Sequence, residues 1–389
     1  MAPDPKPYRV YRGGRTKGKV PAPARPGRLP RNGAGGGASG DYRGPGAAPG
    51  RRRLRRGRVV GLVLLALLVL LIVWAVASWI SFSSGVADAN KRLDPNAKLA
   101  LTHQGGLLTS HPTTVLVLGT DNARVGGREG DRHSDSILLL RTDPKHHRLY
   151  YLSIPRDLVV PIPGAGTQKI NAAFQVGGPA LAIRTIRNFT SLPINHVVVV
   201  NFADFKDLID ALGGIEVDVP KPIRSNHFDC PYSTQARCDK WPGWRFEKGK
   251  QHMSGERALI YSRIRENLLD PAETDFTRGA RQQAVLDATA SKFTSFGTLV
   301  RMPFSGSSFV KPLTTDLTAG QLVQLGWTKF RASDASSVHC RLGGDFGGGG
   351  TGSPSEDNPE AIAMFLGRSA PQPPTGQFEP GCVIGHTLR

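Results

Sequence analysis

The chain has 389 residues, of which 39% are hydrophobic, enough to form one or two folded domains. Its net charge of +19 is unevenly placed: residues 1–58 hold 16 Lys or Arg against two acids, +14, which leaves +5 for the rest. This distribution excludes a uniformly basic nucleic-acid-binding domain. An uncharged run of 24 residues, Val59–Phe82, excludes an ordinary cytosolic enzyme.

The run Val59–Phe82 predicts a transmembrane helix, because about 20 apolar residues cross the hydrocarbon layer. The arginine-rich stretch 51–58 precedes it, and clustered basic residues stay on the cytoplasmic side. The sequence therefore predicts a single-pass type II protein of the cell membrane, with everything after the span outside the cell. Trp74 and Trp79 suit a membrane boundary. A cleaved signal peptide is the alternative, because the segment 75–77 (AVA) resembles a cleavage site.

The regions that flank the span differ in composition. Residues 1–58 are rich in Pro, Gly and Arg, which predicts a disordered basic cytoplasmic tail. Residues 83–112 are polar and contain the Asp94-Pro95 break, which predicts an extracellular stalk. The folded body is expected over 113–342. The last segment, 343–389, is expected to be a Gly-rich loop and a C-terminal piece tied down by a disulfide.

Within the body, short apolar runs alternate with longer amphipathic segments. The predicted strands are 114–119, 136–141, 149–154, 196–202, 215–219 and 337–342. The predicted helices are 171–176, 179–190, 203–212, 254–262, 277–294 and 317–330. Strands that alternate with helices imply a layered α/β domain.

All four cysteines follow the span, in a compartment where disulfides persist. Their order in the sequence favours Cys230–Cys238 and Cys340–Cys382, although three pairings are possible. A four-cysteine zinc site is the alternative, but the chain has no C-x-x-C pair.

Acidic residues stand at the ends of predicted strands, where ligands bind in α/β sheets. Asp121 follows the first strand and Asp135 precedes the second, so the two carboxylates could share a hard cation such as Mg²⁺. Asp157 follows the third strand and is a candidate for the general base, or for a residue that orients Arg156. Each of these aspartates could instead be a turn residue, since Asp is common in turns.

Five arginines lie beside predicted elements: Arg156 follows the third strand, Arg263 and Arg265 follow the helix predicted over 254–262, and Arg278 and Arg281 lie at the start of the helix predicted over 277–294. Arg278 and Arg281 are three positions apart and share one helix face. The planar guanidinium group suits a diphosphate, and Mg²⁺ would neutralise the remaining charge. The alternative is a set of surface ion pairs.

Eight motifs in this order resemble the LytR-CpsA-Psr family of cell-wall ligases, over about residues 113–295. They are Gly119-Thr120-Asp121, Ser134-Asp135-Ser136, Ile154-Pro155-Arg156-Asp157, Lys169-Ile170-Asn171-Ala172-Ala173, Gly177-Gly178-Pro179, Asp210-Ala211-Leu212-Gly213-Gly214-Ile215, Tyr261-Ser262-Arg263-Ile264-Arg265 and Asp275-Phe276-x-Arg278-x-x-Arg281-Gln282.

The resemblance implies a central mixed sheet flanked by helices, with a lipid tail held between sheet and helices. It implies transfer of a glycopolymer from a polyprenyl-diphosphate carrier to a muramic acid hydroxyl of peptidoglycan. Asp121 and Asp135 match the Mg²⁺-associated aspartates of the family. Its diphosphate-binding residues are matched by Arg156, Arg263, Arg265, Arg281 and Gln282.

We therefore expect a membrane-anchored, Mg²⁺-dependent phosphotransferase that uses Asp121 and Asp135 for the metal. Its partners would be the lipid-linked glycopolymer, such as teichoic acid or arabinogalactan, the peptidoglycan acceptor and the membrane. Two alternatives stay open: a pyrophosphatase that releases the polymer without transfer, and a membrane-tethered transcriptional attenuator. The attenuator would need a cytoplasmic nucleic-acid-binding domain, and residues 1–58 have no helix-turn-helix pattern, so no nucleic acid is expected.

Overall fold

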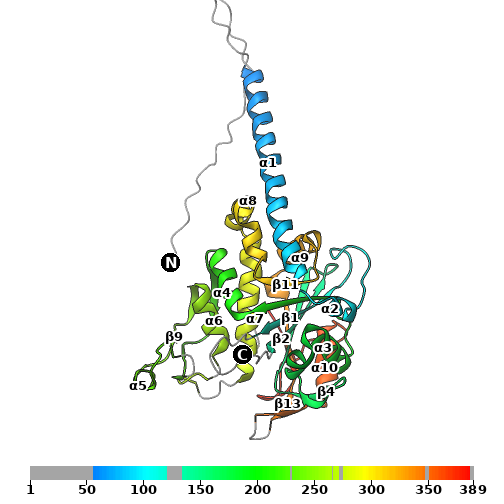
Figure 1. Cartoon of the computed structure of the whole chain (residues 1–389), viewed down its shortest axis with the longest axis vertical. Coiled ribbons are helices and arrows are strands. Elements are labelled where there is room, and N and C mark those ends of the chain that lie inside the picture. Colours follow the sequence, from blue (N-terminus) through cyan, green and yellow to red (C-terminus); the bar gives the residue numbers. More distant parts are fainter. Residues whose placement is uncertain are drawn as a thin grey trace, which may run out of the picture. The chain divides into compact units, whose positions relative to one another are not determined.

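A seven-stranded mixed sheet forms the centre of the fold in the computed structural model, which describes residues 56–120, 134–227, 230–264, 266–270, 275–346 and 350–385. The strands lie in the order β11-β6-β1-β2-β3-β12-β15 (Figure 1). Their bounds are β1 Thr114–Thr120, β2 Ser134–Asp143, β3 Arg148–Ile154, β6 His196–Asn201, β11 Leu313–Thr315, β12 Val338–Arg341 and β15 Gly381–Ile384.

The strand directions bring several strand ends to one edge of the sheet. β1 pairs in parallel with β6 and β3 pairs in parallel with β12, while β2 runs antiparallel to both β1 and β3. Consequently β1, β3, β6 and β12 all end at the edge where β2 begins. This edge receives the chain segments that carry most of the predicted site residues.

Alternating side chains pack the two faces of the sheet against different helices. Leu116, Leu139 and Leu152 belong to the core that contains helices α2 (Pro95–Ala100), α3 (Ala172–Thr190) and α10 (Asn358–Phe365). Leu138 and Tyr151, one position away, pack on the other face toward α7 (Asp275–Phe293) and the end of α9 (Ala319–Arg331). Successive side chains of a strand point to opposite faces of the sheet, and both faces of these strands are apolar. This is expected for a sheet that helices cover on both sides.

A second core lies beside the sheet and is built around α7. The antiparallel pair of β7 (Ile215–Val219) and β10 (Gly249–Met253) packs against α4 (Phe202–Ala211), α6 (Gly255–Arg263) and α7. Smaller elements complete the described chain: β4 Val159–Ile162, β5 Gly166–Lys169, β8 Ile223–Arg224, α5 Gln235–Cys238, β9 Arg245–Phe246, β13 Gly344–Phe346 and β14 Gly352–Pro354.

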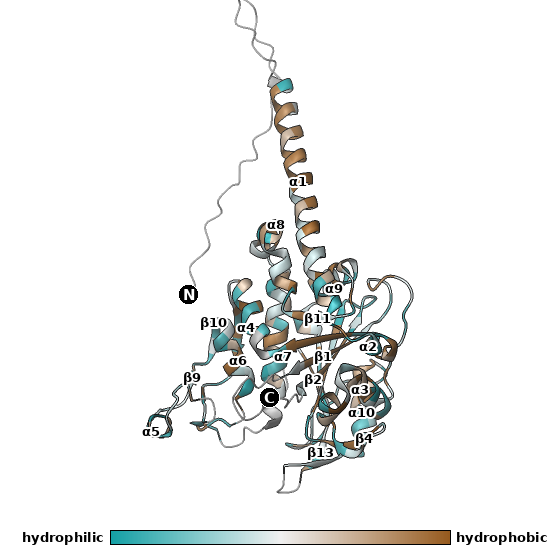
Figure 2. Ribbon diagram, in the orientation of Figure 1, coloured by the Kyte–Doolittle hydropathy of each residue, from teal (hydrophilic) through white to brown (hydrophobic). Residues whose placement is uncertain are grey.

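The predicted stalk is wrong, because residues 83–112 are part of the folded body. Helix α1 covers Arg56–Lys91 and so extends nine residues beyond the predicted end of the span at Phe82. Val86 and Ala89 are buried against α8 (Phe296–Val310), and α2 packs on α3. The burial of Val86 and Ala89 was not predicted from the sequence, because polar residues surround them in this part of α1. α1 is the one helix of the described chain that is long and apolar enough to cross a membrane (Figure 2).

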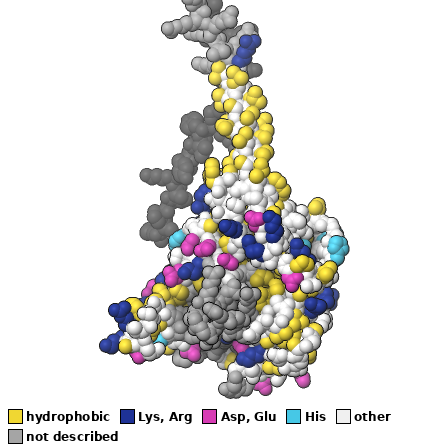
Figure 3. All heavy atoms as spheres, in the orientation of Figure 1, with side chains coloured by type: hydrophobic (Ala, Val, Ile, Leu, Met, Phe, Trp, Pro, Cys, Tyr) yellow, Lys and Arg dark blue, Asp and Glu magenta, His cyan; other side chains and the backbone are white. Residues whose placement is uncertain are grey.

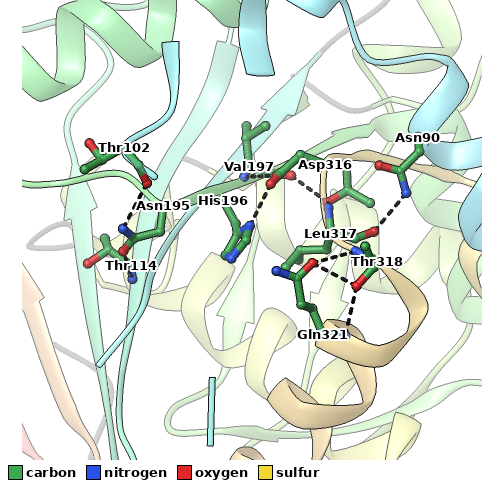
Figure 4. A network of polar contacts seen from close by, with 11 residues as sticks. Asn90, Thr102, Thr114, Asn195, His196, Val197, Asp316, Leu317, Thr318 and Gln321 are labelled. Atoms are coloured by element: carbon green, nitrogen blue, oxygen red, sulfur yellow. Dashed lines mark hydrogen bonds and ion pairs between the residues drawn. The ribbon is translucent and has the colours of Figure 1, made fainter. Parts of the chain in front are cut away.

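A polar network joins this end of α1 to the sheet (Figure 4). Asn90 donates to the carbonyl oxygen of Leu317 at 2.8 Å, next to Asp316. Asp316 accepts from the backbone of Val197 at 2.7 Å and contacts Nδ1 of buried His196 at 2.6 Å. These bonds connect α1, the start of β6 and the segment between β11 and α9. The C-terminal end of α1 is therefore built into the domain and is no flexible linker.

The C-terminal segment is also more ordered than predicted. The stretch predicted as a Gly-rich loop forms the hairpin β13–β14 on either side of residues 347–349. Beyond it, α10 buries Phe365 in the main core and β15 adds an edge strand beside β12. Helices predicted over 171–176 and 179–190 are one helix, α3, kinked at Gly177 and Gly178. Gly178 has φ of +58°, which favours glycine.

Candidate active site

The first part of the site is the edge of the sheet between β1 and β2. Thr120, the residue before Asp121, pairs with Ser134, the residue before Asp135. The register shifts between Gly119 and Thr120, so the pairing is irregular at this point. Asp121 lies outside the described residues, and of Asp135 only the backbone, within β2, is described. The end of β1 at Thr120 and the start of β2 at Ser134 therefore lie side by side at this edge.

The loop after β3 carries Arg156 and Asp157 at the same edge. The Nε atom of Arg156 lies 3.2 Å from Oδ2 of Asp157, and Lys169 Nζ lies 2.8 Å from Oδ1. The side chains of Arg156 and Asp157 are only 14% and 17% exposed. The backbone is held as well, since Asn171 N–H donates to the carbonyl oxygen of Arg156 at 3.2 Å and Gly352 N–H donates to that of Asp157 at 3.1 Å. The start of α3 and the hairpin β13–β14 thus fix the position of Arg156.

The environment of Asp157 favours its charged form. Burial raises the pKa of this carboxyl, but the hydrogen bond from Lys169 and the charge of Arg156 outweigh burial and lower it. A carboxylate with a lowered pKa that already accepts from two cations is a poor proton acceptor. The arrangement therefore favours Asp157 as a residue that orients Arg156 over Asp157 as the general base.

The first turns of α7 approach this loop closely because of one glycine. A Cβ on Gly279 would lie 2.8 Å from Oγ of Ser153, near the end of β3. Its neighbours on α7, Arg278 and Arg281, are 8% and 5% exposed. Arg281 also donates through Nη2 to the carbonyl oxygen of Ile264, which caps α6 directly after Arg263. The contacts bring the end of β3, the start of α7 and the end of α6 together.

The structure thus brings together the segments that bear Arg156, Arg263, Arg278 and Arg281. Arg263 lies in the last turn of α6 and is partly exposed. Arg265 lies outside the described residues. Gln282 is partly buried on α7, and its neighbour Gln283 donates to the carbonyl oxygen of Cys340 on β12 at 3.2 Å.

Two basic residues near this edge had no role assigned from the sequence. Lys169 stood in a recognised motif, but only its distance to Asp157 shows what it does. Arg341, at the end of β12, is 7% exposed and donates to the carbonyl oxygens of Gly376 and Glu379 at 2.7 and 3.0 Å. Burial lowers the pKa of Arg341 to about 10, although Glu379 opposes the shift. Its position at a strand end was visible in the sequence, whereas its carbonyl partners were not.

The predicted metal ligands, Asp121 and Asp135, each come directly after one residue of the pair Thr120 and Ser134. No group of three or more His, Cys, Asp or Glu that could hold a metal ion gathers among the described side chains, which include neither Asp121 nor Asp135. Two carboxylates are a donor set that suits Mg²⁺, which prefers oxygen ligands and keeps several waters. The pairing of Thr120 with Ser134 is compatible with such a site.

Both cysteine pairs favoured by sequence order are bonded in the structure. Cys340 and Cys382 face each other on the neighbouring strands β12 and β15. Cys230 and Cys238 close a small loop within residues 223–246, at the end of the molecule that carries α5 (Figure 1). In that insert Trp241 and Trp244 pack edge to face, 5.5 Å apart.

Comparison with known proteins agrees with the fold and the motifs. The LytR_cpsA_psr family model matches residues 76–340. The chain is 31% identical over 254 residues to the polyisoprenyl-teichoic acid–peptidoglycan teichoic acid transferase TagU of Bacillus mycoides, covering 65% of this chain and 76% of that protein. It is 35% identical over 194 residues to TagV of Bacillus subtilis, covering 49% of this chain and 46% of that one.

Solved structures show the same architecture. TagT bound to LIIa-WTA matches with a TM-score of 0.52 and 26% identity, over 68% of this chain and 94% of that one. The crystal structure of B. subtilis TagV matches with a TM-score of 0.50 and 27% identity, over 67% and 99%. The family model covers well over half of the chain and includes every strand and helix around the site except the C-terminal elements. The chain therefore belongs to the LytR_cpsA_psr family.

Proposed function

We propose that this protein transfers an anionic glycopolymer from a polyprenyl-diphosphate carrier to peptidoglycan during cell-wall assembly. The observation that carries the proposal is the convergence of Arg156, Arg278 and Arg281 at one sheet edge, each largely buried. Buried or half-buried guanidinium groups bind phosphate oxygens through paired hydrogen bonds. The names of the relatives TagU and TagV, and the solved structure of TagT bound to LIIa-WTA, support the same substrate class.

The proposed reaction is a phosphoryl transfer. The acceptor hydroxyl oxygen attacks the phosphorus bonded to the sugar, and a new phosphorus–oxygen bond forms. The bond from this phosphorus to the bridging oxygen breaks, so the polyprenyl phosphate leaves and the hydroxyl proton passes to a base or to water. Arg156, Arg263, Arg265 and Arg281, with Arg278 and Gln282, would bind the diphosphate and stabilise the charge that develops. Asp157 and Lys169 would keep Arg156 in place.

We further propose that Asp121 and Asp135 hold Mg²⁺. A bound Mg²⁺ would neutralise charge on the diphosphate oxygens and orient them. The support is the pairing of Thr120 with Ser134, the residues directly before the two aspartates, together with the chemistry of two carboxylates.

The proposed orientation places the tail 1–58 in the cytoplasm and the folded body outside the cell. The arginine-rich stretch 51–58 directly before α1 supports this orientation. Protease added to intact protoplasts should degrade the body, and a reporter fused after Arg389 should work only if it is exported. A protected C-terminus would contradict the orientation and with it the access to peptidoglycan.

A transfer assay tests the activity itself. The purified full chain, in vesicles, is incubated with polyprenyl-diphosphate glycopolymer and with or without peptidoglycan. The account predicts polymer bound to the peptidoglycan and little soluble product. Soluble polymer at the same rate with and without acceptor would indicate the pyrophosphatase alternative.

A further inference from the structure

Helix α8 exposes large apolar side chains at its N-terminal end. Phe296 and Phe304 are 82% and 87% exposed, and Leu299 and Val300 are about half exposed. The whole helix, FGTLVRMPFSGSSFV, contains one charged residue, Arg301. Contiguous exposed apolar side chains of this size mark a surface that contacts a protein or a membrane.

Contacts along α8 show that it runs beside the membrane helix α1. Trp74 Nε1 donates to the carbonyl oxygen of Val300 at 3.3 Å, and Ser307 N–H donates to Oγ of Ser81 at 3.3 Å. Both pairs are 226 positions apart, so the two helices run in the same direction in one register.

Two glycines allow the backbones of α1 and α8 to approach closely near the contact of Ser307 with Ser81. A Cβ on Gly85 would lie 2.7 Å from Cα of Ser307, and a Cβ on Gly306 would lie 3.0 Å from the backbone nitrogen of Phe82. Side chains of α1 and α8 also share a buried core that contains Val86 and Phe309. The position of α8 against α1 is therefore fixed by backbone contact, and α8 rises beside α1 (Figure 1).

The register between α1 and α8 determines how deep the exposed N-terminal end of α8 lies in the membrane. Trp74 lies inside the apolar run Val59–Phe82, which is about 36 Å long as a helix, against about 30 Å for the hydrocarbon layer. Val300, at the level of Trp74, therefore lies about 12 Å inside the end of this run at Phe82, and Phe296, level with Leu70, lies deeper. Figure 3 shows the apolar surface of α1 continuing down to the body.

The charge of Arg301 is compatible with a position of α8 inside the hydrocarbon layer. Its guanidinium group donates to the carbonyl oxygens of Leu212 at 2.8 Å and Gly297 at 3.4 Å, so its charge is turned toward the body. Long basic side chains commonly place their charge away from the hydrocarbon in this way.

We propose that the first turns of α8, Phe296–Phe304, insert into the bilayer beside α1 as a second membrane contact, with lipid acyl chains around Phe296, Leu299 and Phe304. Because α8 runs parallel to α1, its first turns enter the layer alongside α1, with Phe304 level with Ser78 and Phe296 level with Leu70. This contact adds the apolar surface of α8 to the part of the protein that the bilayer covers beside α1. The inference needs only α1 to span a membrane and is independent of the proposed transfer reaction.

Depth-dependent quenching of a fluorophore tests the proposal. Phe296→Cys and Phe304→Cys are made in the full chain, labelled with a nitrobenzoxadiazole maleimide and reconstituted in phosphatidylcholine–phosphatidylglycerol vesicles. All four cysteines are bonded in disulfides, so the label reaches only the new thiol. Leu99→Cys is the matched control, because Leu99 is 83% exposed but lies on α2, beyond the end of α1.

The proposal predicts strong quenching of the labels at 296 and 304 by lipids brominated in their acyl chains, and at least threefold weaker quenching by aqueous iodide than for the label at 99. Circular dichroism of each labelled variant checks that it is folded. Iodide quenching at 296 and 304 equal to that at 99, with no effect of the brominated lipids, would overturn the proposal.

Discussion

The ammonium group of Lys169 lies 2.8 Å from Asp157, whose second carboxylate oxygen lies 3.2 Å from Arg156. Three residues from two segments thus form one chain of contacts, with an anion between two cations. The arginine is the only member of this chain that the sequence assigned to the substrate. Its two neighbours determine where its guanidinium group points.

Asp157→Asn should separate positioning from base catalysis. If Asp157 orients Arg156, the variant should raise KM for the lipid-linked substrate and keep the pH dependence of kcat. A general base would instead cost about 100-fold or more in kcat and remove the acidic limb of the pH–rate profile. Asp143→Asn is the control, because Asp143 is similarly buried, 15% exposed, and pairs with His146 at the opposite end of β2.

Replacing Arg156 or Arg263 by Ala should weaken binding of a polyprenyl diphosphate at least tenfold, because a charged hydrogen bond contributes about 1.5–3 kcal/mol. Lys should restore little, since an ammonium group cannot make the planar two-pronged contact. Calorimetric titration with a short-chain prenyl diphosphate measures the effect. Arg148→Ala, at the exposed start of β3, should bind normally, and unaltered affinity in both site variants would refute the assignment.

The lowered pKa of Asp157 predicts how stability depends on pH. The pKa of Asp157 is lower in the folded protein than the value of 3.8 for the unfolded chain, so its charge stabilises the fold fully above pH 3.8. This stabilisation is lost as the pH falls through the pKa of the folded protein. Wild type should therefore be more stable than Asp157→Asn at pH 7, and the difference should shrink below pH 4. Thermal unfolding of both proteins between pH 3 and 7 measures it. A difference that stays constant to the lowest pH would show that the charge of Asp157 contributes nothing.

Lys329 should matter for stability through a buried polar cluster on the other side of the sheet. Its Nζ lies 2.6 Å from Oδ1 of Asp287, which also accepts from the hydroxyl of Tyr151 at 2.7 Å. Burial lowers the pKa of Lys329, but Asp287 and Asp334 outweigh it and raise the pKa. The stabilisation is therefore present at neutral pH and lost only as the pH rises through the raised pKa.

We expect Lys329→Met to lower the free energy of unfolding by about 1–3 kcal/mol, because Asp287 loses its charged partner. Tyr151→Phe removes one neutral donor and should cost less. Urea unfolding at pH 7 measures both. Equal costs in the two variants would show that the ion pair does not determine the stability of the cluster.

The strands β1, β2, β3 and β6 and the helices α4, α6 and α7 follow from the sequence because each has an apolar run of clear period. Helix α8 could not be predicted from the sequence. Its helix propensity is reduced by Gly297, Pro303, Gly306 and three serines. Its helical state depends on packing against α1. The end of α1 and β15 were missed for the same reason, since their burial depends on partners far away in the chain.

In the candidate site, too, the residues themselves could be predicted from the sequence, whereas their contacts with distant segments could not. Arg156, Arg278 and Arg281 were recognisable from residue type and position after a strand or at a helix start. The partners of these arginines were not, because Ser153 meets Gly279 and Ile264 meets Arg281 only after three elements have packed together. Sequence spacing predicts which residues share a helix face, whereas it says little about which elements meet.

The two disulfides should contribute unequally. Cys340–Cys382 closes a segment of 42 residues and joins two strands of the main sheet, so its loss should cost about 2–5 kcal/mol. Cys230–Cys238 closes eight residues in an exposed insert, and its loss should leave the main unfolding transition nearly unchanged. Differential scanning calorimetry of the two double Cys→Ser variants compares them. A larger loss of Tm from the insert variant would contradict this ranking.

The fate of the sugar-linked phosphorus tests the central claim most directly. The full chain is given a lipid-linked glycopolymer with ³²P in the phosphate next to the sugar, together with peptidoglycan. The account predicts that this label becomes bound to peptidoglycan with the polymer, while the lipid keeps the other phosphate. Label recovered as soluble phosphate or soluble polymer phosphate, with none on the peptidoglycan, would contradict it.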